Sequence, residues 1–398
     1  MTNKYRKINE LTYYVGANDR KTHLFENNWP LPHGVSYNSY LIADKFSAII
    51  DTIEFGSDKN FLSNINEILK GKTLDYLIIN HMEPDHSGSI GTLLTMYPNI
   101  KLVGNAQTFK ILNSYFKVNT ENFLSVKDGD TLDLGTIKLS FALIPWVHWP
   151  ETMVTIDTTN KVLFSCDAFG GFGTLDGGIF DDEHDFESEY LDDMRRYYSN
   201  IVGKYSGMVQ KAFAKLAGVD IKVIAPSHGL IWRSNPTKVL TLYDNWSKYV
   251  SEKGVVIAYA SMYGNTEKMA DMIASLLSER GVRNIKIYDV SKSHISYILS
   301  DIWKYKGLIL GTCAYNTQMH PMMDHLCNEI KLIAPKEKRV AVFGSFSWNG
   351  AGVKNLKSTL SSMGMEIIEP IVEISGSDVE NKFLSQAEKL ADLFSSKL

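Results

Sequence analysis

The sequence predicts an α/β protein of two domains, in which the second domain is a doubly wound parallel sheet. Three observations support this prediction. The chain has 398 residues, which is too long for one ordinary hydrophobic core. Short apolar runs end in polar loops in the first part, whereas strand and helix patterns alternate regularly in the second. The pattern changes near Ser251–Gly254, which we expect to be a short linker between residues 1–250 and residues 254–398.

Composition and charge exclude several classes of function. The net charge of −4 comes without a basic block, so we expect no nucleic-acid partner. No apolar run is long enough to span a membrane, and the N-terminal MTNKYRKINE lacks the apolar core of a signal peptide. We therefore expect a cytoplasmic protein without a membrane partner. Three scattered cysteines provide neither a disulfide scaffold nor the Cys-x-x-Cys pairs of a fused electron carrier.

The first domain begins with a hairpin-like pair of apolar runs, YNSYLIA and FSAIIDTI. Further on, the run LDYLIIN ends at Asn80, and the next six residues supply His81, Glu83, Asp85 and His86. We expect an extended loop here, in which alternate side chains converge on one side. A helix is predicted to begin near Ser87, since serine is a favourable N-cap.

Three more candidate ligands lie at the ends of apolar runs. They are His148 after LSFALIPWV, Asp167 after VLFSC and His228 after IKVIAPS. A single histidine or aspartate in such a place is usually structural. Four histidines and three carboxylates, all at strand exits, instead indicate a metal centre displayed by a rigid sheet.

The second domain contains five apolar runs, VVIAYA, IKIYDV, GLILGT, RVAVFG and PIVEI, separated by helical patterns. Met269, Ile273 and Leu277 keep the spacing of a helix that buries one face. Strands and helices that alternate in this way predict a sheet of flavodoxin type.

Ligand-binding loops are expected after the first, third and fourth strands of this sheet, where its crevice opens. The loop SMYGNTEKMAD offers the hydroxyls of Ser261 and Thr266 and backbone N–H groups around Gly264, which suit a mononucleotide phosphate. It has neither the lysine of a Walker motif nor a G-x-G-x-x-G pattern, so ATP and dinucleotides are disfavoured. In GTCAYNTQMHP and GSFSWNGAG, Tyr315 and Trp348 are placed to flank a planar ring.

The pattern His-x-Glu-x-Asp-His, followed by a distant His, Asp and His, resembles the flavodiiron branch of the metallo-β-lactamase superfamily. Zinc hydrolases of that superfamily carry His at the position of Glu83, and a carboxylate there suits iron. The three loops are similar to those of flavodoxins and flavodiiron proteins, except that Ser347 stands where relatives carry Gly. The resemblance implies a metallo-β-lactamase-like αββα sandwich followed by a flavodoxin-like domain.

The resemblance also implies cofactors, two non-haem irons per chain and FMN, and the residues that hold them. One iron takes His81, Glu83 and His148, the other takes Asp85, His86 and His228, and Asp167 bridges them. Some relatives do not use the residue matching His86, so its ligation stays open. The FMN contacts are Ser261, Met262, Tyr263, Gly264, Asn265, Thr266, Thr312, Ala314, Tyr315, Asn316, Ser345, Phe346, Ser347, Trp348, Asn349 and Gly350. Tyr198 and His23 are predicted to hydrogen-bond near the irons, with Tyr197 and His33 as the alternatives.

The implied activity is reduction of O2 to water, of NO to N2O, or of both, and the sequence leaves the choice of gas open. Electrons pass through FMN from a rubredoxin-like donor, and the assembly is a head-to-tail homodimer or a homotetramer. Two alternatives remain open at this point. One is a zinc hydrolase fused to a flavodoxin-like domain, against which Glu83 argues. The other is a flavin-dependent electron-transfer or sensing protein whose metal is structural.

Overall fold

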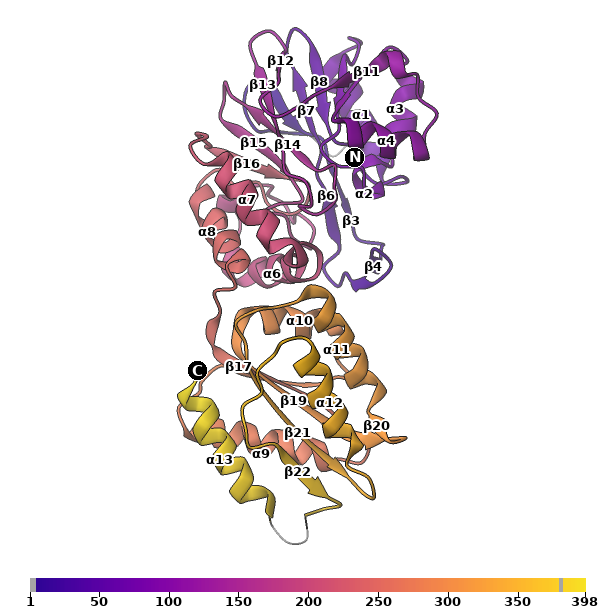
Figure 1. Cartoon of the computed structure of the whole chain (residues 1–398). Coiled ribbons are helices and arrows are strands. Elements are labelled where there is room, and N and C mark those ends of the chain that lie inside the picture. The colour runs from indigo at the N-terminus through magenta and orange to yellow at the C-terminus, as the bar shows by residue number, and fades with distance from the viewer. Residues whose placement is uncertain (1–4, 379–381) are drawn as a thin grey trace. The chain divides into compact units, whose positions relative to one another are not determined.

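The computed structural model describes residues 5–378 and 382–398, and the chain divides into two compact units between Ser247 and Lys248 (Figure 1). The expected linker Ser251–Gly254 is wrong, because strand β17 (Glu252–Ala260) already includes Glu252 to Gly254. The preceding helix ends at Ser247, before the expected linker. Gly254 packs closely within the strand, since an added Cβ would lie 2.5 Å from the Tyr305 ring.

The first unit contains two large sheets. The seven-stranded sheet has the order β1 (Arg6–Lys7), β2 (Thr12–Tyr14), β7 (Tyr40–Ala43), β8 (Ser47–Ile50), β9 (Tyr76–Ile78), β10 (Lys101–Gly104), β11 (Phe123–Ser125). The five-stranded sheet has the order β12 (Thr131–Asp133), β13 (Lys138–Leu143), β14 (Met153–Asp157), β15 (Val162–Cys166), β16 (Val223–Pro226). Two short ribbons pair β3 (Ala17–Asp19) with β6 (Val35–Tyr37), and β4 (Leu24–Phe25) with β5 (Trp29–Pro30).

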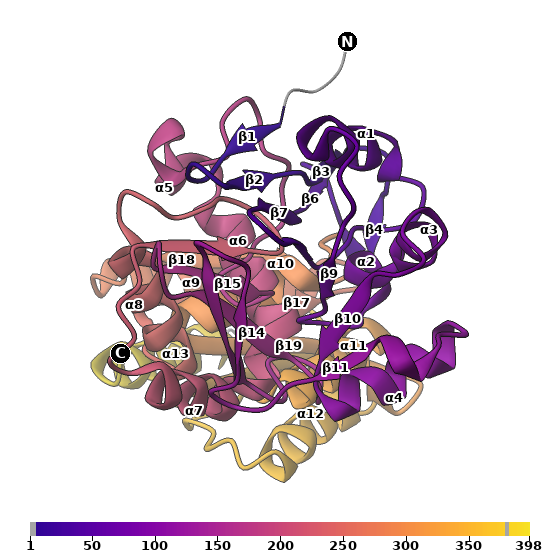
Figure 2. The same ribbon diagram turned by 90° about the horizontal axis from the view of Figure 1, so that it is seen from above.

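Helices cover both outer faces of this pair of sheets, as the two views in Figures 1 and 2 agree. One side carries α1 (Asp58–Leu69), α3 (Ile90–Met96) and α4 (Ala106–Tyr115), and the other carries α7 (Ser206–Leu216) and α8 (Pro236–Ser247). Short helices complete the unit: α2 (Pro84–Ser87), η1 (Thr120–Asn122), η2 (Asp181–Glu183), α5 (Phe186–Glu189), α6 (Leu191–Tyr197), η3 (Tyr198–Val202) and η4 (Gly203–Tyr205). Strands β8, β14 and β15 are buried along their whole length, as strands covered on both faces are. The predicted αββα sandwich is confirmed.

Two local predictions in this unit have different outcomes. The hairpin is confirmed, because β7 and β8 pair antiparallel from Tyr40 opposite Ile50 to Ala43 opposite Ser47. The helix expected near Ser87 begins earlier, at Pro84. Proline is favoured at a first helical position, because its fixed φ suits the helix and its missing N–H group is not needed there. Asp85 and His86 therefore lie in a helical turn and not in an extended loop.

The second unit is the predicted doubly wound sheet. Its strands follow the order β18 (Ile285–Asp289), β17, β19 (Tyr305–Tyr315), β21 (Arg339–Phe346), β22 (Val372–Ser375), all parallel, with β20 (Gln318–Met319) beside β19. In chain order of its main strands this is 2-1-3-4-5, the flavodoxin-like order. The helices are α9 (Asn265–Glu279), α10 (Ile295–Lys304), α11 (Pro321–Ile333), α12 (Ala351–Ser362) and α13 (Lys382–Ser396).

The core of the second unit joins the sheet to α9 and α13. The spacing predicted for α9 is confirmed, because Met269, Ile273 and Leu277 are buried against Val255 and Ile257 of β17. Across the described residues of both units, no helix has the length and apolar character needed to cross a membrane.

Candidate metal centre and flavin crevice

The seven predicted metal ligands converge at one edge of the first unit, although they come from four separate stretches of the chain. His81 follows β9, His148 follows β13, Asp167 directly follows β15, and His228 follows β16. Glu83 is the N-cap of α2, which carries the other two. The carboxyl ends of strands and the start of a helix therefore display these side chains from a rigid frame.

The seven side chains form two groups, in each of which the potential ligand atoms lie within 4.8 Å of one another. The first group contains His81, Glu83, His148 and Asp167, and the second contains Asp85, His86 and His228. In the first, Oε2 of Glu83 lies 3.0 Å from Nε2 of His148 and 3.2 Å from Nε2 of His81. In the second, Oδ2 of Asp85 lies 3.2 Å from Nε2 of His228 and 3.3 Å from Nε2 of His86.

Asp167 lies between the two groups and presents one oxygen to each. Its Oδ2 is 3.2 Å from Nε2 of His148 and 3.4 Å from Nε2 of His81. Its Oδ1 is 2.9 Å from Nε2 of His86 and 3.6 Å from Nε2 of His228. A carboxylate in this position can bind two cations at once.

The buried polar atoms that lack a hydrogen-bond partner show that this donor set fits metal cations. Buried polar atoms are normally hydrogen-bonded, and exceptions call for an explanation such as an ion. Buried atoms without a hydrogen-bond partner gather here: both Oδ atoms of Asp85 and of Asp167, both ring nitrogens of His86, and Nε2 of His148 and of His228. A mixed set of imidazole nitrogens and carboxylate oxygens suits iron, whereas soft thiolate ligands would favour other metals.

The electrostatics of the cluster also call for cations. Burial alone would lower the pKa of His81, but hydrogen bonds to Glu151 and Glu83 outweigh it and raise the pKa to about 10. Burial would also lower the pKa of His148, but Asp167 and Glu83 outweigh this effect and raise the pKa to about 10. Burial would raise the pKa of Asp167, but His86 and His148 hold it well below the usual range. The carboxylates thus draw protons onto the imidazoles, and metal ions that bind here must displace those protons.

Residues behind the ligands orient the imidazole rings. Nδ1 of His81 donates to Oε1 of Glu151 at 2.7 Å, and the same oxygen accepts from the Met82 N–H at 3.0 Å. Nδ1 of His228 donates to the Ser36 carbonyl at 2.7 Å. Both contacts leave Nε2 directed at the cluster, as a metal ligand requires. The sequence analysis missed Glu151, although its place three residues after His148 in HWPE was a usable signal.

The backbone beside the ligands adopts the left-handed conformation at three non-glycine residues. Trp146 has a φ of 67°, Cys166 a φ of 58°, and Phe169 a φ of 70°. Such residues cost about 1–3 kcal/mol each and persist where the surrounding structure imposes them, often at functional sites. They flank His148 and Asp167, so the chain accepts strain to present these two side chains.

The tyrosine predicted to hydrogen-bond near the irons, Tyr198, has its hydroxyl paired with another residue. The hydroxyl of Tyr198 bonds Ser206 Oγ at 2.9 Å, and its ring packs on Tyr243 and Trp246. Its neighbour Tyr197 faces the cluster instead, with its ring centre 5.4 Å from that of His228.

Histidines of the N-terminal stretch are exposed. His23 lies on the surface, and Nδ1 of His33 bonds Asp193 Oδ2 at 2.7 Å. Trp149 packs against the His81 ring at 5.1 Å between ring centres and forms a wall of the site.

Glu26 is a further residue at the cluster that the sequence analysis missed. Its Oε2 accepts from Nε1 of Trp29 at 2.9 Å, and its carboxyl group hydrogen-bonds Glu83. Partial desolvation and the charge of Glu83 raise the pKa of Glu26 to about 7. A surface ribbon, β4 and β5, carries this residue, and ribbons of two-residue strands leave little pattern in a sequence.

The three loops predicted to bind flavin begin at the same level of the second sheet. Ala260 at the end of β17 pairs with Thr312 of β19, and Thr312 pairs with Gly344 of β21. The loops that follow these strands therefore share one edge of the sheet, at its carboxyl ends. Ligands of doubly wound proteins bind at that edge.

The first loop has the shape of an anion nest. Gly264 has a φ of 88°, which glycine adopts without strain, and its N–H donates to Ser261 Oγ at 3.0 Å. Helix α9 begins at Asn265, whose side chain bonds the Gly376 carbonyl at 3.0 Å. The hydroxyl of Thr266 is buried and pairs with that of Ser345 at 2.9 Å, which joins the first loop to the third.

Aromatic side chains stand exposed around this edge. The exposed fraction is 93% for Tyr263, 77% for Trp348 and 41% for Tyr315. Large exposed aromatics grouped in this way mark a binding site, and they suit the faces of a planar ring. The backbone turns sharply after Tyr315, because Asn316 has a φ of 44°. Around these side chains lie Met262, Phe346, Ser347 and Asn349, exposed or half-buried, while Thr312 is buried beneath them.

Comparison with known proteins agrees with both halves of this description. Residues 35–229 match the model of the ODP family beta lactamase, and residues 257–389 match that of flavodoxin. The chain is 35% identical over 360 residues to the anaerobic nitric oxide reductase flavorubredoxin of Escherichia coli O1:K1. The aligned region covers 89% of this chain and 75% of that protein.

Solved structures resemble the whole chain. Rubredoxin oxygen:oxidoreductase from the anaerobe Desulfovibrio gigas superposes with a TM-score of 0.93 at 30% identity, over 99% of this chain and 98% of that one. The flavodiiron protein from Giardia intestinalis has a TM-score of 0.93 at 25% identity, over 99% and 97% of the two chains.

Proposed function

Because this chain belongs to the flavodiiron protein family, we propose that it reduces O2 to water, NO to N2O, or both, at a non-haem diiron site that receives electrons through FMN. O2 takes four electrons and four protons to give two waters, and two NO take two electrons and two protons to give N2O and one water. The observation that carries the proposal is the position of Glu83. It supplies a carboxylate to a cluster that also holds Asp85 and Asp167.

The chain's own residues have defined tasks in this proposal. His81, Glu83 and His148 would hold one iron, Asp85, His86 and His228 would hold the other, and Asp167, which presents one oxygen to each group, would contact both. His86 is included because its Nε2 faces both Asp85 and Asp167. When bound, the irons and FMN supply the one-electron chemistry that amino acids lack. Glu151 and the Ser36 carbonyl keep the rings of His81 and His228 oriented, and burial of the ligands limits access of water.

The flavin-binding loops divide their work by chemistry. Backbone N–H groups around Gly264 and the start of α9 would bind the phosphate of FMN, since this nest is uncharged and lies at the helix N-terminus. Tyr315 and Trp348 would flank its ring. The pair Thr266 and Ser345 joins the two loops. Ser347, in place of glycine, would stand beside the ring and would alter the flavin potentials through the local peptide.

The electron donor in this proposal is rubredoxin or a similar small carrier. The D. gigas protein is named for rubredoxin, and the E. coli relative is a flavorubredoxin. The three cysteines, Cys166, Cys313 and Cys327, are buried and stand apart in the sequence, so they do not form such a carrier here.

We also infer a head-to-tail homodimer, alone or paired into a tetramer. Only four residues separate the end of α8 at Ser247 from the start of β17 at Glu252. Four residues span at most ~14 Å, which restricts how one chain can bring its two sites together. Pairing FMN of one chain with the irons of a second removes this restriction.

Mixing an Asp167→Ala chain with a chain that cannot bind FMN tests this dimer, because exchanged subunits should recover part of the activity. Confirmed exchange without recovery would contradict the dimer.

Steady-state kinetics on iron-replete protein tests the main proposal. The protein is kept anaerobic, and measured amounts of O2 or of NO are then added. The assay uses reduced rubredoxin as donor, and metal analysis of the same sample accompanies it. We expect two irons per chain and turnover of at least one gas. A stoichiometric zinc pair with hydrolase activity would support the zinc alternative. Full iron and FMN without turnover of either gas would favour an electron-transfer or sensing role.

A further inference from the structure

A second feature of the metal-binding unit is a cavity of about 400 Å³ between the five-stranded sheet and the helices α7 and α8. Its lining includes Ile144, Val147, Val154 and Leu163 on the sheet side and Val209 and Phe213 on α7. The side chains of the sheet are buried, whereas Ala217 and Thr241 at the helix side are exposed. The cavity therefore opens to solvent beside these two residues, and its lining is mostly hydrocarbon, with Ser165, Tyr243 and Asp244 as further polar members.

The lining of the cavity reaches the backbone that carries two of the metal ligands. Val147 directly precedes His148, and Ala168 directly follows Asp167. Phe169 completes this wall, packed on the ring of Tyr243 with 4.7 Å between the ring centres. The wall of the cavity therefore includes residues that directly adjoin His148 and Asp167 in the chain.

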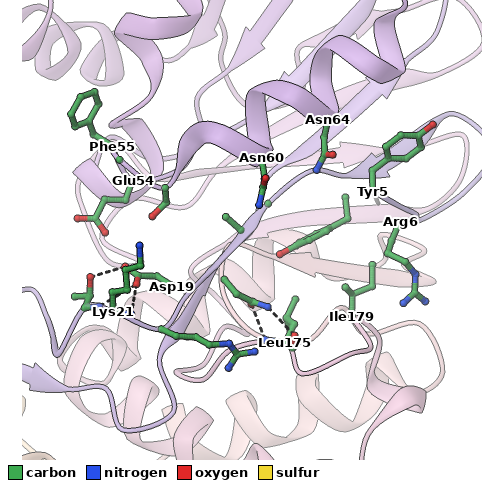
Figure 3. Close-up of a pocket in the computed structure, with 18 of the residues that line it drawn as sticks. Tyr5, Arg6, Asp19, Lys21, Glu54, Phe55, Asn60, Asn64, Leu175 and Ile179 are labelled. Atoms are coloured by element: carbon green, nitrogen blue, oxygen red, sulfur yellow. Dashed lines mark hydrogen bonds between the residues drawn. The ribbon is translucent and has the colours of Figure 1, made fainter. Parts of the chain in front are cut away.

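A larger pocket of the same unit has the opposite chemistry. It measures about 920 Å³, and Figure 3 shows carboxylate, ammonium and amide groups around it, among them Asp19, Lys21, Glu54 and Asn60. Charged and amide groups hold water and exclude an uncharged, weakly polar solute. An apolar cavity does the reverse, because it gains little from water and binds atoms such as xenon.

We propose that the apolar cavity is a binding site for the diatomic gas substrate, from which the gas passes between Val147 and Ala168 to the cluster. This inference rests on the proposed function and adds the route of its substrate. O2 and NO are small and nearly apolar, so they distribute into hydrocarbon from water. A site that concentrates them beside Asp167 raises the rate at low gas concentration and leaves the rate at saturation unchanged.

Xenon, an apolar probe of similar size, tests the binding site without any turnover. Anaerobic crystals of the full iron- and FMN-loaded protein are pressurised with xenon, and its anomalous signal is located. We expect xenon in the cavity between the sheet and α7, and none in the polar pocket. Absence of xenon from the cavity would overturn the proposal, whatever the activity of the enzyme.

Two variants of helix α7 test delivery. Ala212→Trp fills the cavity, whereas Ala214→Trp, on the same helix but exposed and outside the lining, is the matched control. Ala212→Trp should lower kcat/KM for the gas by about tenfold and leave kcat at saturating gas and iron content unchanged. Ala214→Trp should change neither. Leu240→Trp, from α8, repeats the test if Ala212→Trp loses iron. Wild-type turnover with unaltered kcat/KM in the filled variants would refute delivery, whereas absence of wild-type turnover would refute the proposed function.

Discussion

The metal cluster and the flavin crevice differ most in how much of each site the protein completes by itself. All seven candidate ligands are buried, and Asp167 has no exposed surface. At the crevice, the side chains that flank the ring position stand in solvent, with Trp348 exposed by 77%. The difference follows from the chemistry of the ligands. A cation is held by converging charges that must be oriented in advance, whereas a planar ring is held by surfaces that it covers itself.

The metal cluster and the flavin crevice also differ in the formal charge of their side chains. The cluster places three carboxylates among four imidazoles in the interior, an arrangement that is costly unless cations bind. The crevice uses hydroxyl and backbone N–H groups near the start of α9, which carry no formal charge. Loss of one member should therefore damage the cluster far more than the crevice, and the predictions below test this.

The largest effect is expected for Asp167→Ala. Removing the carboxylate that faces both groups leaves their charges uncompensated, at a cost of about 3–5 kcal/mol in iron binding. Both irons should be lost together, as measured by iron content and Mössbauer spectroscopy, while FMN content stays normal. Retention of both irons would show that Asp167 does not bridge.

A smaller effect is expected for Glu151→Gln, which keeps the size of the side chain that orients His81. Iron affinity should fall by roughly 10–100-fold, as for other residues behind metal ligands. Glu189→Gln is the matched control, because Glu189 also pairs with a histidine, His184, at 3.3 Å but away from the cluster. Chelator competition measures the affinity. Equal losses in the two variants would contradict an orienting role for Glu151.

The crevice should respond more mildly and in two separable ways. Thr266→Ala removes a hydroxyl that joins the first and third loops and that is predicted to contact the phosphate, and should weaken FMN binding by about 1.5–3 kcal/mol. Ser347→Gly should leave binding nearly unchanged and shift the flavin potentials. Fluorescence titration and redox titration measure the two quantities. Equal losses of affinity would refute this division of roles.

The last prediction concerns the half-buried Lys338 of the second unit. Nζ of Lys338 donates to Ser251 Oγ at 2.8 Å and to the Tyr305 carbonyl at 2.9 Å. Burial lowers the pKa of Lys338 from 10.5 to about 7.

Between these two pH values the unfolded chain holds a proton that the folded chain has released, so the free energy of unfolding should rise with pH. The slope is at most about 1.4 kcal/mol per pH unit. Denaturant unfolding, with FMN release as the readout, measures this slope. Lys338→Met should lose the slope, whereas the exposed Lys389→Met should keep it. An unchanged slope in Lys338→Met would assign the effect to other groups.

The fold class, the seven candidate ligands and the three loops can be predicted from the amino-acid sequence. Each of these leaves a local record. His81 to His86 lie within six residues, and the strands of the second unit are continuous apolar runs between helical patterns. Periodicity and short motifs report what a segment does with its own neighbours, which is sufficient to place a ligand at a strand exit.

The residues that stand behind the candidate ligands depend on tertiary packing, which the sequence pattern does not record. Glu151 orients His81, Tyr197 rather than Tyr198 faces His228, and Glu26 reaches Glu83 from a surface ribbon. The two tyrosines are adjacent on a helical path, where a rotation of about 100° per residue separates a side chain at the cluster from one in the core. The packing of distant segments fixes that rotation. A motif within one segment therefore does not carry the information.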